Sequence, residues 1–160
     1  MVVKIRKARP EDAAVVAAGL RQSDTVELAA EHGLGLSSLE AVSRSLAVSE
    51  LAWTALLDGK PFCVFGVSTV DTEVGSPWLL ATDAFAAVPA KTILRQNRKY
   101  VKIMLHKYKY LYNFVYHKNE TSIKWLKTIG FRVHDSILPF SRGLYGGKFY
   151  LFDLVRSELN

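Results

Sequence analysis

Residues 116–131, YHKNETSIKWLKTIGF, contain the start, body and end of one helix, followed by the first residue of a strand. Asn119 suits the start because its short side chain accepts a hydrogen bond from a backbone N–H of the first turn. Gly130 can adopt the positive φ at which helices end, and Phe131 then begins an apolar strand. The pattern predicts a helix over residues 121–129 that connects two strands.

The chain before this stretch alternates between strand and helix patterns. Ser37 and Glu40 fit a capping box, and Asp58-Gly59 is a preferred two-residue hairpin turn. We predict strands at 2–8, 51–57, 61–67, 76–83 and 111–116, and helices at 10–22, 24–32, 37–46 and 92–107.

The end of the chain adds a final pair of strands. Residues 131–134 and 148–154 are apolar and are separated by a glycine-rich turn at 143–147. Strands that pair with their neighbours and helices that lie between them are typical of an α+β sheet with helices on its faces.

This element order, together with residues 116–131, resembles the GNAT (Gcn5-related N-acetyltransferase) fold. In that family an Asn at the end of the fifth strand caps a helix that stops at Gly-Phe, as Asn119, Gly130 and Phe131 do here. The resemblance implies an α+β fold with a mixed, mostly antiparallel sheet and helices on both faces. We expect residues 1–160 to form a single GNAT-like domain.

A narrower resemblance covers residues 78–154. The segments 104–108 and 111–115, then Asn119 and 125–130, look like the internal virion protein of short-tailed autographivirus-type phages. This resemblance implies a phage or prophage protein of virion morphogenesis with other virion proteins as partners. It also implies a location in the host bacterial cytoplasm, with incorporation in the virion as a further possibility.

Length and composition exclude several classes of protein. The chain has 160 residues, of which 49% are apolar and 22% charged, as in an ordinary folded domain. No apolar run approaches the roughly 20 residues that cross a bilayer, so we expect no membrane partner. Cys63 is the only cysteine and the four histidines are scattered, so we expect no disulfide and no metal site.

The net charge of +6 is distributed unevenly along the chain. Residues 11–83 hold three Lys or Arg and eleven acids, whereas residues 84–127 hold ten Lys or Arg and one acid. Helical spacing places six of the basic residues on one face: Arg95, Arg98, Lys99, Lys102, His106 and Lys109. This face fits simple solvation, contact with nucleic acid without sequence preference, binding of CoA phosphates, or an acidic protein partner.

The resemblance to GNAT enzymes fails at the loop that binds phosphate. Those enzymes hold the pyrophosphate of acetyl-CoA on backbone N–H groups of a Gln/Arg-x-x-Gly-x-Gly/Ala loop between the fourth strand and the next helix. Residues 84–98 contain no glycine, and none occurs between Gly75 and Gly130. Pro89 also removes an N–H group. If acetyl-CoA does bind, the resemblance points to these residues: Ala84, Phe85, Lys91, Arg95, Arg98 and Asn119.

The acid that many GNAT enzymes use in acetyl transfer is also absent from this chain. Many GNAT enzymes carry a Tyr four residues before the Gly of Gly-Phe, whereas this chain has Leu126, which has no proton to give. Asp83 and Glu27 are the candidate catalytic bases, although each also fits a solvated surface acid. Two hypotheses follow: a phage morphogenesis protein without acetyl transfer, or an acetyl-CoA-dependent N-acetyltransferase with an atypical phosphate-binding loop.

Overall fold

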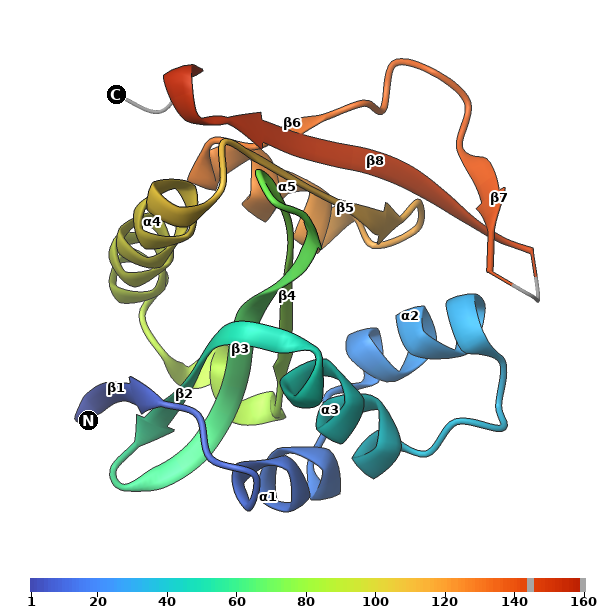
Figure 1. Cartoon of the computed structure of the whole chain (residues 1–160). Coiled ribbons are helices and arrows are strands. Elements are labelled where there is room, and N and C mark those ends of the chain that lie inside the picture. The colour runs from blue at the N-terminus through green and yellow to red at the C-terminus, as the bar shows by residue number, and fades with distance from the viewer. Residues whose placement is uncertain (144–145, 159–160) are drawn as a thin grey trace.

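The computed structural model describes residues 1–143 and 146–158, which form one eight-stranded sheet with helices on both faces (Figure 1). The strand order is β1-β2-β3-β4-β5-β8-β6, and β7 pairs with the same strand, β8, as β6 does. All pairs are antiparallel except β4 and β5. The strands are β1 Val3–Lys7, β2 Ser49–Leu57, β3 Lys60–Asp71, β4 Val74–Ala81, β5 Tyr110–Tyr116, β6 Arg132–Val133, β7 Phe140–Arg142 and β8 Gly147–Val155.

Five α-helices and two short 3₁₀-helices connect these strands within the described residues. None of them combines the length and the apolar character needed to cross a membrane. The helices are α1 Asp12–Ala18, α2 Gln22–His32, α3 Ser38–Ala47, α4 Ala90–Lys107 and α5 Glu120–Ile129, with η1 Asp83–Ala87 and η2 Arg156–Glu158.

The sheet separates two apolar clusters, because successive side chains of a strand point to opposite faces. On β3, Val64 joins the cluster under α1 and α3, whereas Phe65 and Val67 join the larger cluster under α4 and α5. The predicted α+β class with a mostly antiparallel sheet and helices on both faces is therefore confirmed.

The helix starts and the helix end that the sequence predicts have the expected geometry. The side chain of Asn119 accepts a hydrogen bond from Ser122 N at 3.2 Å, and Gly130 has a φ of 123°. Ser37 Oγ likewise accepts a hydrogen bond from Glu40 N at 3.1 Å. Both helix starts therefore follow from side chains within three residues of the cap.

Several predicted boundaries were wrong. The helix expected at 10–22 ends at Ala18, and a second helix begins at Gln22. The strand expected at 76–83 ends at Ala81, so that Asp83 lies in η1.

The final strand pair is also more complex than predicted. A further strand, β7, pairs with β8. Residues 144–145 of the predicted glycine-rich turn lie outside the described residues.

The parallel contact between β4 and β5 is short. It comprises only Val74 with Tyr110 and Gly75 with Leu111, after which the two strands diverge (Figure 1). Gly75 allows this close approach, because a Cβ atom there would lie 2.6 Å from a methyl group of Val67 and 2.7 Å from the ring of Tyr108. The divergence opens the sheet at its centre.

Candidate functional site

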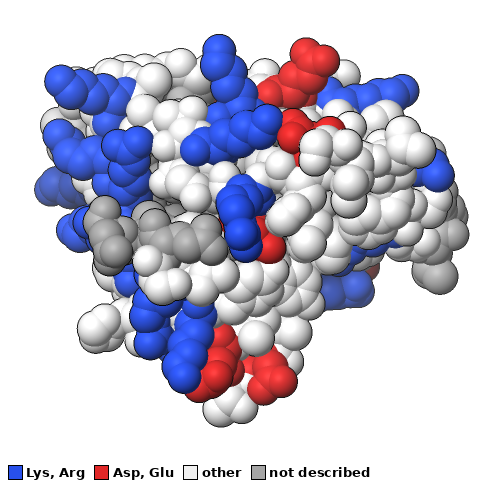
Figure 2. Space-filling view, turned by 90° about the horizontal axis from the view of Figure 1, so that it is seen from above, with Lys and Arg blue, Asp and Glu red and all other residues white. Residues whose placement is uncertain are grey.

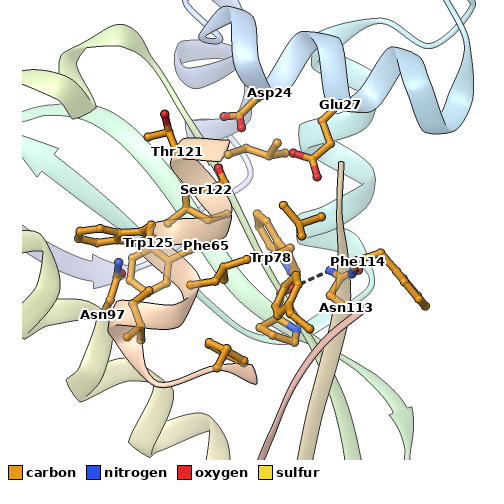
Figure 3. Close-up of a pocket in the computed structure, with 18 of the residues that line it drawn as sticks. Asp24, Glu27, Phe65, Trp78, Asn97, Asn113, Phe114, Thr121, Ser122 and Trp125 are labelled. Atoms are coloured by element: carbon orange, nitrogen blue, oxygen red, sulfur yellow. Dashed lines mark hydrogen bonds between the residues drawn. The ribbon is translucent and has the colours of Figure 1, made fainter. Parts of the chain in front are cut away.

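A cleft of about 700 Å³ lies where β4 and β5 diverge. Residues of α2, α4 and α5 complete its walls, so segments from both faces of the sheet meet there (Figure 3). Most of its large side chains are apolar or aromatic: Phe65, Trp78, Leu80, Tyr100, Met104, Phe114, Trp125, Leu126 and Phe131. Such a lining favours an apolar group, and the few polar side chains would fix its orientation.

Where β4 and β5 diverge, their backbone N–H and C=O groups lose each other as partners, and side chains form hydrogen bonds with some of them instead. Asn113 of β5 donates from Nδ2 to the carbonyl oxygen of Pro77 on β4 at 2.7 Å, which Figure 3 marks with a dashed line. The Oδ1 atom of Asn113 accepts from Phe114 N at 2.8 Å. Because the N and C=O of one strand residue point the same way, the ring of Pro77 also lies on this edge, where it offers no donor.

An ion pair on α2 forms another part of the wall. Asp24 is buried, and its Oδ2 accepts from Arg21 Nε at 2.8 Å and from Ala81 N at 2.9 Å. The Arg21 guanidinium also lies 4.8 Å from the centre of the Phe85 ring. The pair therefore holds the start of α2 against the end of β4. Both of its charged groups already have partners within the chain.

Glu27, one of the two predicted bases, points into the cleft from α2 (Figure 3). Its carboxylate accepts from Tyr116 N at 2.8 Å and from Asn119 Nδ2 at 3.4 Å. Burial raises the pKa of Glu27 to about 7, and the hydrogen bond from Tyr116 N only partly opposes it. Glu27 can exchange a proton near neutral pH, but both oxygens also connect α2 to β5 and α5.

The other predicted base, Asp83, is exposed in η1 and does not line the cleft. At the position of the family's tyrosine acid, Leu126 does line it, so this part of the wall is aliphatic. Tyr100 also lines the cleft, and burial raises its pKa, which makes it a weaker acid. Among the described residues no group of three or more His, Cys, Asp or Glu is placed to hold a metal ion.

The six predicted cofactor residues are not brought together. Only Phe85 lines the cleft, while Asn119 caps α5 at its edge. Lys91, Arg95 and Arg98 are exposed on α4 and do not reach the cleft lining. Ala84 lies in η1 beside Phe85.

The backbone between β4 and α4 does not fit a pyrophosphate. In this segment Ala84 N donates to Thr82 Oγ1 at 3.3 Å, Phe85 N to Thr82 O at 3.0 Å, and Val88 N to Phe85 O at 3.3 Å. These three N–H groups therefore serve the chain's own 3₁₀ turn, and residues 84–88 include no glycine at which the backbone could approach a phosphate closely.

Sequence reasoning missed the polar contacts of the cleft. Asn113 and Pro77 are 36 residues apart, and Glu27 and Tyr116 are 89 apart. The one local signal was the spacing of Arg21 and Asp24, which suits an ion pair across one helical turn.

Several solved structures with the same fold are acetyltransferases. An acetyltransferase of the GNAT family from Streptococcus pneumoniae is 18% identical, with a TM-score of 0.63 over 96% of this chain and 99% of that one. Spermidine N-acetyltransferase from Vibrio cholerae, in complex with CoA and spermine, is 10% identical, with a TM-score of 0.71 over 98% and 97%. Aminoglycoside N(6')-acetyltransferase from Legionella pneumophila is 13% identical, with a TM-score of 0.71 over 98% and 94%. The predicted GNAT-like fold is confirmed.

A sequence family gives a different kind of similarity. Residues 63–137 match the family described as "Bacteriophage T7, probable scaffold protein Gp13". No curated protein matches the sequence significantly. The matched residues include most of β3 and all of β4, α4, β5 and α5, which form most of the cleft wall; α2 and Phe152 of β8 complete it from outside the match. The match supports the predicted link to phage proteins.

Proposed function

We propose that this chain is a phage or prophage protein of virion morphogenesis that uses a GNAT-like fold for binding and does not transfer acetyl groups. The observation that carries the proposal is the match of residues 63–137 to the phage scaffold family. It covers the diverging strands and the two helices beside them, so the similarity includes the part of the fold that holds the cleft.

The chemistry around the cleft supports the loss of acetyl transfer. The backbone N–H groups at 84, 85 and 88 bond within the chain. The three cations proposed for CoA phosphates are exposed and do not line the cleft, and Leu126 replaces the family's acid. A cleft with these walls suits an apolar segment of a partner better than a phosphorylated cofactor.

The partners in this proposal are other virion proteins, which the chain meets in the host bacterial cytoplasm and accompanies into the virion. Residues 1–160 act in it as a single domain. The test is deletion of the gene from the phage that carries it, with the protein supplied from a plasmid. We expect deletion to lower the yield of infectious particles at least tenfold and the plasmid to restore it.

A cleft variant makes this experiment specific. Trp125→Ala removes a half-buried ring from the cleft wall, and Lys60→Ala changes an exposed residue at the start of β3 that does not line the cleft. We expect Lys60→Ala to restore particle yield and Trp125→Ala to fail, with circular dichroism showing that both are folded. A deletion phage with normal yield would refute the morphogenesis role, whereas full rescue by Trp125→Ala would refute only the role of the cleft.

Acetyl-CoA should leave the thermal stability of the purified protein unchanged. A ligand at a hundred times its Kd stabilises the native state by about 2.7 kcal/mol, which shifts Tm by several degrees for a domain of this size. Differential scanning fluorimetry with 1 mM acetyl-CoA should show no shift, and a GNAT enzyme of similar size serves as the positive control. A shift that Arg95→Ala and Arg98→Ala abolish would contradict the proposal.

The second candidate function is an acetyl-CoA-dependent N-acetyltransferase with an atypical phosphate-binding loop. One observation favours it: Glu27, with a pKa of about 7, faces a cleft of GNAT type. Release of free thiol from acetyl-CoA in the presence of polyamines, aminoglycosides or protein N-termini would support it. The activity would then have to be lost in Glu27→Gln, because the amide cannot take a proton.

A further inference from the structure

The outward face of α4 is uniformly basic. We define it by six exposed residues that fall within an arc of about 100°, at 3.6 residues per turn. The residues are Lys91, Arg95, Arg98, Lys99, Lys102 and His106. The opposite side of α4 carries Ile93, Tyr100, Val101, Met104 and Leu105 into the core. Lys109 does not belong to this face, because α4 ends at Lys107 and Lys109 pairs with Glu73.

The basic face of α4 has no acidic partner within the described part of the chain. The acids near α4 pair with cations outside this face: Glu50 with Lys107 at 2.7 Å, and Asp135 with Lys127 at 2.7 Å. Within the described residues, the only side-chain hydrogen bond of the face joins Arg98 to the carbonyl oxygen of Thr128 at 3.0 Å. A helix face that serves solubility normally mixes both signs, so this arrangement leaves an uncompensated charge.

Figure 2 shows the result on the surface. Lys and Arg side chains gather on the left of the molecule, the side on which Figure 1 shows α4, and the acidic side chains lie elsewhere in this view. The chain from 84 to 132 contains eleven Lys or Arg and one acid. Such a surface attracts an extended anion over distances comparable to the Debye length.

We propose that the basic face of α4 binds the phosphate backbone of double-stranded nucleic acid without reading its sequence. Protein interfaces place aromatic or aliphatic anchors among their charges, whereas the arc of about 100° that forms this face holds only Lys, Arg and His, and Ile103, the one large apolar side chain exposed on α4, lies outside that arc. A phosphate backbone needs no such anchor. The face also lacks aromatic rings on which single-stranded bases would stack.

The dimensions of α4 suit such a contact. Its 18 residues span about 27 Å, and phosphates follow one another at about 3.4 Å of rise along each strand of a duplex. Several cations can therefore contact phosphates at once. Contacts of this kind give dissociation constants on the order of 1–100 µM at physiological salt, together with a steep dependence on salt concentration.

The test is fluorescence anisotropy with a labelled 25-base-pair duplex of arbitrary sequence, titrated with the full chain at 50–300 mM NaCl. The face variant carries Arg95→Gln, Lys99→Gln and Lys102→Gln. The control carries Lys4→Gln, Lys60→Gln and Lys118→Gln, three exposed lysines outside the face. Both variants lower the net charge of +6 by three.

We expect the control to bind nearly as well as the wild type, and the face variant to bind on the order of ten- to a hundredfold more weakly at 50 mM NaCl. The slope of log K against log [NaCl] should fall by about 2.7 in the face variant, or about 0.9 for each lost phosphate contact. A second duplex of unrelated sequence should bind equally well.

Three results would overturn the proposal: no binding by the wild-type chain at 50 mM NaCl, equal loss in both variants, or equally effective competition by polyglutamate at the same charge concentration. The last result would assign the face to an acidic protein. Because the assay needs neither phage nor acetyl-CoA, its failure is separate from failure of the morphogenesis role.

Discussion

Replacement of Asp12 by alanine should lower the free energy of unfolding by about 2–4 kcal/mol, because it removes a buried carboxylate together with the hydrogen bonds that it accepts. Asp12 is 2% exposed. It receives two hydrogen bonds from the Arg6 guanidinium, each at 2.8 Å, and one from Thr54 Oγ1 at 2.6 Å. Arg9 N donates a further bond at 2.8 Å. The carboxylate thus joins the start of α1 to β1 and β2.

Urea denaturation at pH 7 measures this loss. Thr54→Val removes a single hydrogen bond and should cost about 1 kcal/mol, while Glu11→Ala, an exposed neighbour, should stay within about 0.5 kcal/mol of the wild type. If Asp12→Ala lost no more than Glu11→Ala, the network would not hold α1 to the sheet.

Lowering the pH should remove the stabilisation that the Asp12 carboxylate provides. Burial disfavours the charged form of Asp12, but the hydrogen bonds from Arg6, Thr54 and Arg9 outweigh it and hold its pKa at about 2, below the ordinary 3.8. A carboxylate with a lowered pKa stabilises the fold above its unfolded pKa and loses that effect as pH falls. The wild type should therefore lose about 2 kcal/mol between pH 4 and pH 2, and Asp12→Ala should lack this loss.

The sequence predicted the parts of the fold that short-range chemistry determines. Asn119 and Gly130 enclose α5, and the expected helix at 121–129 differs from the observed one by a single residue. Asp58-Gly59 joins β2 and β3 with positive φ at both residues, as the turn type requires. In each case the deciding hydrogen bond or dihedral angle lies within a few residues.

The contacts that shape the cleft could not be predicted in this way. β4 and β5 diverge after Gly75, and the polar groups in the gap are paired across the chain, as Asn113 with Pro77 shows. β7 was not predicted because Phe140, Ser141 and Arg142 show no strand pattern in the sequence. They form a strand because they pair with β8. Register between distant strands depends on packing that a single sequence does not display.

The same limit applied to the candidate site residues. Asp83 and Glu27 were equivalent as acids in the sequence, but the fold exposes one and encloses the other. Lys91, Arg95 and Arg98 were proposed for CoA phosphates because they follow the fourth strand. Their exposure on α4 instead motivates the proposal that they contact an extended polyanion, since a long row of cations can contact many phosphates.

Glu27→Gln should stabilise the protein at pH 8 by about 2 kcal/mol and leave its stability within about 1 kcal/mol of the wild type at pH 4.5. Burial raises the pKa of Glu27 from its ordinary 4.5 to about 7. The folded state therefore holds a proton that the unfolded state releases. As pH rises from 4.5 to 8, the unfolded state gains from ionisation and the wild type loses about 3 kcal/mol, most of it below pH 7.

The glutamine amide escapes this penalty because it is never charged. Its oxygen can accept the hydrogen bond from Tyr116 N, but its nitrogen cannot accept from Asn119 Nδ2, which is why the expected gain is smaller than the full penalty. Urea denaturation at half-unit steps from pH 4.5 to 8 measures both curves. Asp83→Asn, which removes an exposed carboxylate outside the cleft, is measured alongside as the control. If the Glu27→Gln curve ran parallel to the wild type, Glu27 would ionise as freely in the cleft as in the unfolded chain, and it could not be the group that exchanges a proton there near neutral pH.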